Sequence, residues 1–229
     1  MKKGKLYGVS VGPGDPELMT LKAASILQRC DVIAAPRTVG GRALALEIAA
    51  GAVDLSGKQI EYLDFLMTRD PAALDARHAA LATGLAAYLD AGRDVAMLNL
   101  GDASLYGSWN YLCRRLLAQG YAVETVPGVT SFCACAAVLN RSLTEMGSPL
   151  HIFPAAVPNL AETLGLPGGK VLMKPARDIS ETAHAIHAQG LSEKAAAVCD
   201  CGLPTQRVFT DLNQLPEEPG YFTTILIAP

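Results

Sequence analysis

The segment Lys5-Leu-Tyr-Gly-Val-Ser-Val-Gly-Pro-Gly-Asp-Pro-Glu17 joins a hydrophobic run to a glycine-rich turn and a helix start. Asp15 is suited to cap a helix, and Pro16 to occupy its first position. The turn is not a dinucleotide fingerprint, because Glu17 replaces the third glycine and no acidic residue ends the next hydrophobic run. It is not a P-loop either, because no Gly-Lys-Ser/Thr follows. The segment therefore predicts a strand, a turn and a helix of an α/β protein.

Outward from this segment, hydrophobic runs of strand length alternate with helical patterns, which is typical of parallel α/β architecture. After about residue 120 the helices become fewer and shorter, so we predict two α/β domains, residues 1–119 and 120–229. The run at 222–227 alternates little in polarity, which indicates a central strand buried on both faces. The predicted strands are 6–11, 31–35, 59–64, 94–100, 122–126, 150–153, 170–174, 195–199, 207–209 and 222–227, and the predicted helices are 16–28, 41–50, 71–90, 108–119 and 178–189.

The composition of the 229 residues limits the classes of function. Half of them are hydrophobic and 18% are charged, which suits a large core, and the net charge of −3 argues against binding to nucleic acid. No hydrophobic run approaches the roughly 20 residues of a membrane-spanning helix. The basic N-terminus lacks the apolar stretch of a signal peptide, so no membrane association and a cytoplasmic location are expected.

Neither the cysteines nor the histidines form a metal-binding pattern. The six cysteines include two Cys-x-Cys pairs, which differ from the Cys-x-x-Cys of zinc sites, and we expect reduced, buried thiols. His184 and His187 have helical spacing but no third ligand. No metal is therefore predicted.

Two further motifs follow predicted strands, where open α/β sheets bind their ligands. Leu98-Asn-Leu-Gly-Asp-Ala-Ser-Leu-Tyr106 supplies a carboxylate and an aromatic hydroxyl, and Val126-Pro-Gly-Val-Thr-Ser-Phe132 supplies two hydroxyls. A purely structural role is the alternative for both motifs. Asp102 could cap the following helix, and Thr130 or Ser131 could cap the one after it.

In this order and spacing the motifs resemble a known family. Residues 5–23, the Gly-Asp-x-x-x-Tyr element at 101–106 and Val-Pro-Gly-Val-Thr-Ser at 126–131 are similar to the tetrapyrrole methylases of the cobalamin pathway. The resemblance extends over nearly the whole chain. Segments 106–112 and 202–208 look most like the branch that methylates carbon 20 of precorrin-2 or of its cobalt-containing counterpart, cobalt-factor II.

The resemblance implies an S-adenosylmethionine-dependent C-methyltransferase of cobalamin (vitamin B12) biosynthesis. Its implied fold is two α/β domains with a cofactor cleft between them, of the class III methyltransferase type, in a homodimer. Such an enzyme needs no catalytic dyad, because a sulfonium methyl donor requires positioning more than activation. Ala103 departs from the proline that the family often has, but the neighbouring carboxylate is kept. The implied cofactor-binding residues are Pro13, Gly101, Asp102, Thr130, Ser131, Met173, Leu203, Thr223 and Thr224.

Arg37 and Tyr106 are the candidate substrate-binding residues. A tetrapyrrole substrate carries many carboxylates, which the guanidinium fork of arginine binds in a bidentate manner. Arg37 follows the second predicted strand at the expected ligand edge, although a solvated surface arginine is the alternative. Two other functions stay open: another ring methylase of the same family, and a non-catalytic nucleotide- or tetrapyrrole-binding module.

Overall fold

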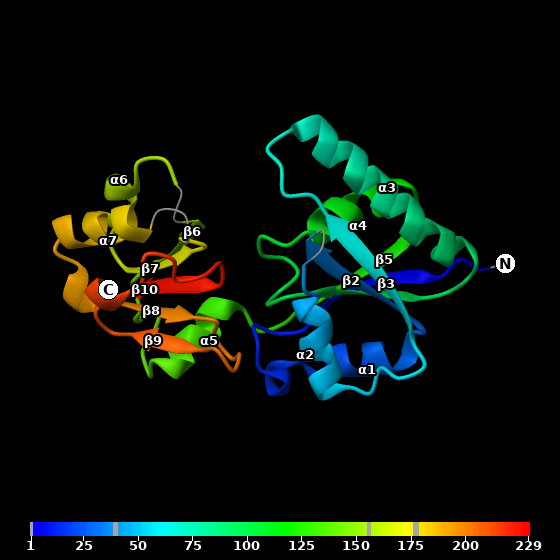
Figure 1. Ribbon diagram of the computed structural model, residues 1–229, viewed down its shortest axis with the longest axis horizontal. Coiled ribbons are helices and arrows are strands. Elements are labelled where there is room, and N and C mark those ends of the chain that lie inside the picture. Colours follow the sequence, from blue (N-terminus) through cyan, green and yellow to red (C-terminus); the bar gives the residue numbers. More distant parts are fainter. Residues whose placement is uncertain (1, 39–40, 155–156, 176–178) are drawn as a thin grey trace. The chain divides into compact units, whose positions relative to one another are not determined.

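The computed structural model describes residues 2–38, 41–154, 157–175 and 179–229 (Figure 1). The chain divides into two compact units, Met1–Thr130 and Ser131–Pro229, and each contains a five-stranded sheet. The predicted boundary after residue 119 differs from this division, because the strand that follows it completes the first sheet.

All the neighbouring strands of the first sheet are parallel, and their order is β3-β2-β4-β1-β5. Parallel strands need crossover connections, and the helices predicted between the hydrophobic runs supply them. The strands are β1 (Lys5–Ser10), β2 (Val32–Thr38), β3 (Gln59–Phe65), β4 (Val95–Asn99) and β5 (Ala122–Val126). The helices are α1 (Leu21–Arg29), α2 (Leu44–Ala52), α3 (Pro71–Asp90) and α4 (Trp109–Ala118), with a 3-10 turn, η1, at Pro16–Leu18.

The helices of the first unit cover both faces of its sheet (Figure 1). Successive strand residues point to opposite faces, so Leu6 joins the core formed with α3 and α4, while Tyr7 joins the core formed with α1 and α2. Gly8 leaves room for the indole of Trp109, since a Cβ on Gly8 would lie 2.3 Å from that ring. A sheet buried on both faces explains why its strands read as continuous hydrophobic runs.

The helix predicted over residues 16–28 is two elements. Asp15 accepts a hydrogen bond from the amide of Glu17 and caps η1, with Pro16 at its first position, as predicted. Thr20 then caps α1 through a bond from the amide of Ala23. The second cap was missed because hydrophobic spacing alone does not reveal a break between two short helices.

The second sheet is mixed, and its order is β6-β7-β10-β8-β9. β6 and β7 are parallel, whereas β10 is antiparallel to both β7 and β8, and β9 is antiparallel to β8. The strands are β6 (Leu150–Pro154), β7 (Gly169–Met173), β8 (Ala195–Cys199), β9 (Arg207–Phe209) and β10 (Thr223–Ile227). The helices are α5 (Ser131–Val138), α6 (Leu160–Leu164) and α7 (Ile179–Ala188), with 3-10 turns η2 (Ser192–Lys194) and η3 (Leu212–Gln214).

β10 is the central strand of this sheet and all its residues are buried, which confirms the predicted central strand, although Phe222, its first predicted residue, is exposed and lies outside β10. Helices α6 and α7 share a hydrophobic core with one face of the sheet, and α5 also packs against β10 (Figure 1). Residue 178, where the last predicted helix began, lies outside the described residues. No helix in the described part of the chain has the length and apolar character to span a membrane.

Candidate functional site

Three loops meet at the carboxyl edge of the first sheet, after the adjacent strands β4, β1 and β5. The loop after β1 pairs with the loop after β4, since the amide of Gly101 donates to the carbonyl of Gly12 at 2.7 Å and Gly12 returns a longer bond of 3.3 Å. Pro13 is buried in the first loop. The structure therefore brings together the three motifs that the sequence placed at strand ends.

The hydroxyl of Ser10 links the ends of β1, β4 and β5 by hydrogen bonds. Ser10 is fully buried, and its Oγ donates to the carbonyl of Val126 at 2.6 Å while accepting from the amide of Ala103 at 2.9 Å. One side chain at the end of β1 is thus bonded to the last residue of β5 and to the loop after β4. Sequence reasoning missed Ser10, although its position at the end of the strand was a usable signal.

Asp102 holds the loop after β4 against the loop after β5. Its Oδ2 accepts from the amide of Gly128 at 2.7 Å, and its Oδ1 accepts from the amide and hydroxyl of Ser104. Burial raises the pKa of Asp102, but these bonds outweigh burial and bring the pKa below its ordinary value. The alternative that Asp102 caps α4 is wrong, because the capping position belongs to Ser108.

The loops approach each other at van der Waals distance. A Cβ added to Gly128 would lie 2.4 Å from the Cβ of Ser10 and 2.7 Å from the carbonyl oxygen of Gly101. Only glycine leaves the room for this approach. The Pro-Gly turn at the end of β5 therefore shapes the loop junction.

Thr130, at the end of the same loop, carries a polar atom that the protein does not satisfy. Its Oγ1 is buried and has no hydrogen-bond partner among the described residues. Buried polar groups nearly always have partners, and an orphan costs about 1–3 kcal/mol. A ligand with a polar group at this position would remove that cost.

A second group of predicted residues gathers at one edge of the second sheet. Because β10 is antiparallel to its neighbours, its first residues face the last residues of β7 and β8, and Thr224 pairs with Met173 while Thr223 pairs with Cys199. Leu203 lies in the loop after β8, where its amide donates to the carbonyl of Asp200 at 2.9 Å. Ser131 is the first residue of α5, the helix that packs against β10.

Three thiols surround these threonines, and sequence reasoning gave them no role. Thr223 Oγ1 lies 3.4 Å from the sulfur of Cys199, and Cys135 hydrogen-bonds to Cys201 and to Thr224. The bond with Cys201 and burial both raise the pKa of Cys135, while burial raises that of Cys199. These two are protonated packing groups. The expectation of buried cysteines is confirmed for Cys30, Cys135, Cys199 and Cys201, but it is wrong for Cys133, which is exposed, and for Cys113, which is half-buried.

A profile of the Tetrapyrrole (Corrin/Porphyrin) Methylases matches residues 5–216. The chain belongs to this family. It is 34% identical to the cobalt-precorrin-2 C(20)-methyltransferase of Salmonella typhimurium, over 98% of this chain and 96% of the relative. Identity to the precorrin-2 C(20)-methyltransferase of Sinorhizobium sp is 32%, over 98% of this chain and 95% of the relative.

Solved structures confirm the predicted α/β fold with two sheets. A cobalt precorrin-4 methyltransferase superimposes with a TM-score of 0.78 at 21% identity, over 98% of this chain and 94% of that one. The uroporphyrin-III C-methyl transferase of Thermus thermophilus, complexed with S-adenosylhomocysteine, gives a TM-score of 0.72 at 24% identity, over 97% of both chains. At these identities the likeness concerns the fold.

The two candidate substrate residues, Arg37 and Tyr106, both lie toward the carboxyl edge of the first sheet, but their surroundings differ. Arg37 is inside β2, which extends past its predicted end, and its guanidinium forms a two-pronged pair with Asp64 on β3, with the shorter Nε–Oδ1 distance 2.6 Å. The fork also lies over the ring of Tyr62. Tyr106 is half exposed in the loop after β4 and has a left-handed backbone, with φ of 50°, a strained conformation that is common at functional sites.

The described residues contain no cluster suited to a metal ion, since no group of three or more His, Cys, Asp or Glu side chains among them is arranged to hold one. His187 hydrogen-bonds to the hydroxyl of Ser192. The best candidate for a ligand site is the loop junction, where the loops after β1, β4 and β5 meet, with the unsatisfied hydroxyl of Thr130 and the close backbone approach at Gly128.

Proposed function

We propose that this tetrapyrrole methylase transfers a methyl group from S-adenosylmethionine to carbon 20 of precorrin-2 or cobalt-factor II. The observation that carries the proposal is the 34% and 32% identity, over 98% of the chain, to two relatives named for that reaction. Metal-free and cobalt-containing substrates are both included, because one relative is named for each.

The cofactor-binding residues proposed are Pro13, Gly101, Asp102, Thr130, Ser131, Met173, Leu203, Thr223 and Thr224. The residues fit such a ligand, because Thr130 carries a buried hydroxyl with no hydrogen-bond partner among the described residues, and Gly128 allows a close approach of the loops that a side chain would block. The cofactor supplies an electrophilic methyl group on a positively charged sulfur.

The chain's own contribution is positioning. Asp102 is ionised and both its oxygens already accept hydrogen bonds, so it holds the loops in shape and is not a free base. Ser10 has the same function from the other side of the junction. A rigid set of loops fixes the ligand geometry that methyl transfer requires.

Methyl transfer is tested with three substrates side by side: metal-free precorrin-2, its cobalt form and uroporphyrinogen III. Each is incubated with S-adenosylmethionine, and the product mass and the methylated carbon are determined by mass spectrometry and NMR. We expect one added methyl at carbon 20 with precorrin-2 or its cobalt form. Methylation of another carbon would favour another ring methylase, in line with 32% identity to the precorrin-4 C(11)-methyltransferase of Mycobacterium tuberculosis. No product with any substrate would favour a binding module.

Cofactor binding is tested with a substitution at Thr130, which should raise the stability of the free protein but lower its affinity for the cofactor. Thr130→Val removes an unsatisfied buried hydroxyl, so the free protein should gain about 1 kcal/mol in stability. The same change should weaken S-adenosylhomocysteine binding roughly two- to tenfold, because the ligand loses a hydrogen bond. Thr83→Val is the control, since its hydroxyl bonds within α3. Calorimetry showing unchanged affinity for the Thr130 variant would contradict the assignment.

We also propose that the protein is a cytoplasmic homodimer, on the strength of the family resemblance. Light scattering at micromolar concentration should give about twice the 24.0 kDa of one chain. A stable monomer with full methyltransferase activity would contradict the dimer, and activity in the membrane fraction of lysed cells would contradict the location.

A further inference from the structure

Two arginines converge on Asp64, near the carboxyl end of the edge strand β3. Arg37, on the neighbouring strand β2, forms the two-pronged pair with its carboxylate. Arg77, near the start of α3, donates from its Nε to the main-chain oxygen of Asp64 at 2.7 Å. The bond from Arg37 lowers the pKa of Asp64 against the effect of burial, and the charges of both arginines lower it further.

The two guanidinium groups reach Asp64 from different faces of the sheet. Successive side chains of a strand point to opposite faces. Leu63 and Phe65 are buried in the core that β3 shares with α3, so the side chain of Asp64, and Arg37 with it, lies on the other face. Arg77 comes from α3 itself. A ligand at this end of the strand can therefore meet a positive group on either side.

Most of the N–H donors of these arginines have no acceptor in the described part of the chain. A guanidinium has five such donors, of which Arg37 uses two and Arg77 one. The acidic residues at the start of α3 are engaged elsewhere, Asp70 as the helix cap and Asp75 in an ion pair with α4. Two positive groups thus share the single carboxylate of Asp64 and retain donors for a further anion.

An aromatic ring lies beside the same cluster. The guanidinium of Arg37 is stacked over Tyr62 at 4.3 Å from the ring centroid. The side chain of Tyr62 is 44% exposed, although large aromatic residues are usually well buried. Stacking holds the fork of Arg37 in a fixed plane. The cluster therefore offers both positive charge and an apolar ring surface.

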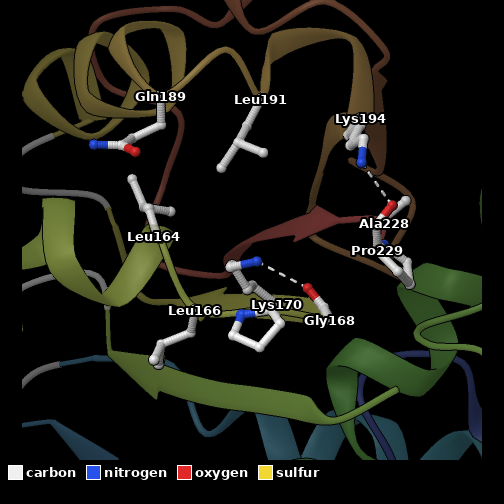
Figure 2. A pocket seen from close by; sticks show the side chains of 11 residues that line it. Leu164, Leu166, Gly168, Lys170, Gln189, Leu191, Lys194, Ala228 and Pro229 are labelled. Atoms are coloured by element: carbon white, nitrogen blue, oxygen red, sulfur yellow. Dashed lines mark hydrogen bonds between the residues drawn. The ribbon is translucent and has the colours of Figure 1, made fainter. Parts of the chain in front are cut away.

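The lysines of the second unit lack this combination. Figure 2 shows a pocket in which Lys170 and Lys194 each donate to a main-chain oxygen, of Gly168 and Pro229 respectively. None of the described residues that line this pocket is aromatic. These two bonds account for the lysines as structural groups.

The position of the arginine cluster suits the outer part of a tetrapyrrole. β3 is two strands away from β4, whose following loop belongs to the loop junction. Neighbouring strands are about 4.8 Å apart, so the separation is on the order of 10 Å. A tetrapyrrole is a ring of comparable width that carries its carboxylates on its periphery. A substrate whose reacting carbon lies at the junction can therefore place peripheral carboxylates beside Asp64.

We propose, on the basis of the proposed function, that Arg37 and Arg77 together bind the acetate and the propionate of one pyrrole ring of the substrate. Each ring of such a substrate carries these two carboxylates on neighbouring carbons. Each guanidinium binds one of them through its unused donors, in charge-assisted hydrogen bonds. Tyr62 contacts the pyrrole ring with its exposed surface. Asp64 offsets the repulsion between the two arginines in the free protein.

The test compares uroporphyrin III with coproporphyrin III, which carries methyl groups in place of the acetates. Binding to the full chain, saturated with S-adenosylhomocysteine, is followed by porphyrin absorption at constant ionic strength. The wild type should prefer uroporphyrin roughly tenfold, the effect of one charge-assisted pair. Arg77→Gln should lose most of this preference, because uroporphyrin binding weakens while Arg37 still binds the propionate of coproporphyrin.

Further variants separate recognition from structural support. Arg37→Gln should lose the preference as well, and Arg77→Lys should keep part of it, since lysine retains the charge but not the fork. Arg93→Gln is the matched control, because Arg93 also bonds to a residue of β3, Gln59, and lies over a tyrosine, Tyr88, but at the amino end of the strand. It should keep the full preference. Thermal midpoints show that each variant is folded.

Three results would overturn the proposal. The first is an unchanged preference in a folded Arg77→Gln variant. The second is an equal loss of both porphyrins in that variant, which would mean that Arg77 only ties α3 to β3. The third is the same loss of preference in Arg93→Gln, which would mean that only the total charge of the protein matters.

These outcomes differ from a failure of the proposed reaction, which is measured by methyl transfer in the wild type. Methylation of precorrin-2 together with an unchanged preference in Arg77→Gln would remove the carboxylate site and leave the reaction. A preference that Arg77→Gln abolishes, in a protein that methylates none of the substrates, would support the carboxylate site and remove the reaction.

Discussion

Asp102 contributes to stability through its ionised form, because the amides of Ser104 and Gly128 bond to the carboxylate. Its pKa in the folded protein is lowered, so this stabilisation is present above the unfolded pKa of about 3.9 and is lost as the pH falls through the folded value. Asp102→Asn should therefore cost about 1–2 kcal/mol at neutral pH. The difference from the wild type should shrink below about pH 4.

Urea unfolding of both proteins at pH 7 and pH 3 measures this difference. Ser104→Ala provides the comparison, because it removes only a hydroxyl bonded to the same carboxylate. An Asp102→Asn penalty of equal size at both pH values would show that the side chain acts through its shape and not its charge.

A test of substrate binding by Arg37 must include Asp64, because the guanidinium of Arg37 already pairs with that carboxylate. If Arg37 binds a substrate carboxylate, Arg37→Ala should lower tetrapyrrole affinity about tenfold and leave S-adenosylhomocysteine affinity unchanged. Asp64→Asn should then maintain or raise tetrapyrrole affinity, since it releases the fork. Steady-state kinetics and separate cofactor titrations measure both. Equal losses in the two variants would mean that the pair only supports the strands.

At the scale of elements, the loop junction depends on the absence of a side chain at Gly128. Gly128→Ala would force a Cβ against Ser10 and the carbonyl of Gly101, at 2.4 and 2.7 Å. We expect a loss of about 1–3 kcal/mol and weaker S-adenosylhomocysteine binding. Gly84→Ala is the matched control, because Gly84 lies inside α3 with nothing within 4 Å of the added Cβ.

The control should gain about 0.5–1 kcal/mol, since alanine favours a helix interior over glycine. Denaturant unfolding and calorimetry on the two variants give both quantities. Normal stability and cofactor affinity in Gly128→Ala would show that the loops relax without loss. Gly101 is a less suitable probe, because its φ of 68° strains any residue with a side chain.

Elements with a strong local signal were predictable from the sequence. The helix at 71–90 has the predicted bounds because Asp70 caps it, Pro71 starts it and Gly92 follows its end. The central position of β10 was predictable because burial on both faces removes polar alternation. The break between η1 and α1 at Thr20 was not predictable, since the hydrophobic spacing continues across the capping residue.

The placement of the candidate residues after strand ends was predictable, but the hydrogen bonds between them were not. Ligand loops follow strand ends in any parallel sheet, so Gly101 and Thr130 were placed correctly at a strand edge. The pairing of Arg37 with Asp64 depends on β2 and β3 being neighbours, which is a property of strand order. The bond from Gly128 to Asp102 likewise joins loops that lie far apart in sequence. Local patterns do not contain such information.

At the scale of the whole molecule, the change to shorter helices near residue 120 does indicate a second unit, but the two units divide after Thr130. The second unit does have shorter helices, as predicted, but β5 at 122–126 pairs with β1 and belongs to the first unit. Hydrophobic runs do not state which sheet a strand joins. The two boundaries, after residue 119 and after Thr130, therefore give different predictions for isolated fragments.

A fragment of residues 1–130 should fold by itself. It contains all five strands of the first sheet and the helices on both faces, with their two hydrophobic cores. Circular dichroism should show its helices, and urea should unfold it in one cooperative transition.

A fragment of residues 1–119 should not fold in the same way, because it lacks β5 and Tyr121. The edge of β1 would lose its pairing with β5. Residues Leu6–Ser10, which are buried in the whole chain, would then lie on an open edge. Ser10 Oγ would also lose the carbonyl of Val126, and Asp102 the amide of Gly128. An uncovered, hydrophobic strand edge promotes aggregation, so light scattering should show large particles for this fragment and not for 1–130. Cooperative unfolding of both fragments with equal midpoints would mean that β5 contributes nothing to the first unit and that its boundary lies after residue 119.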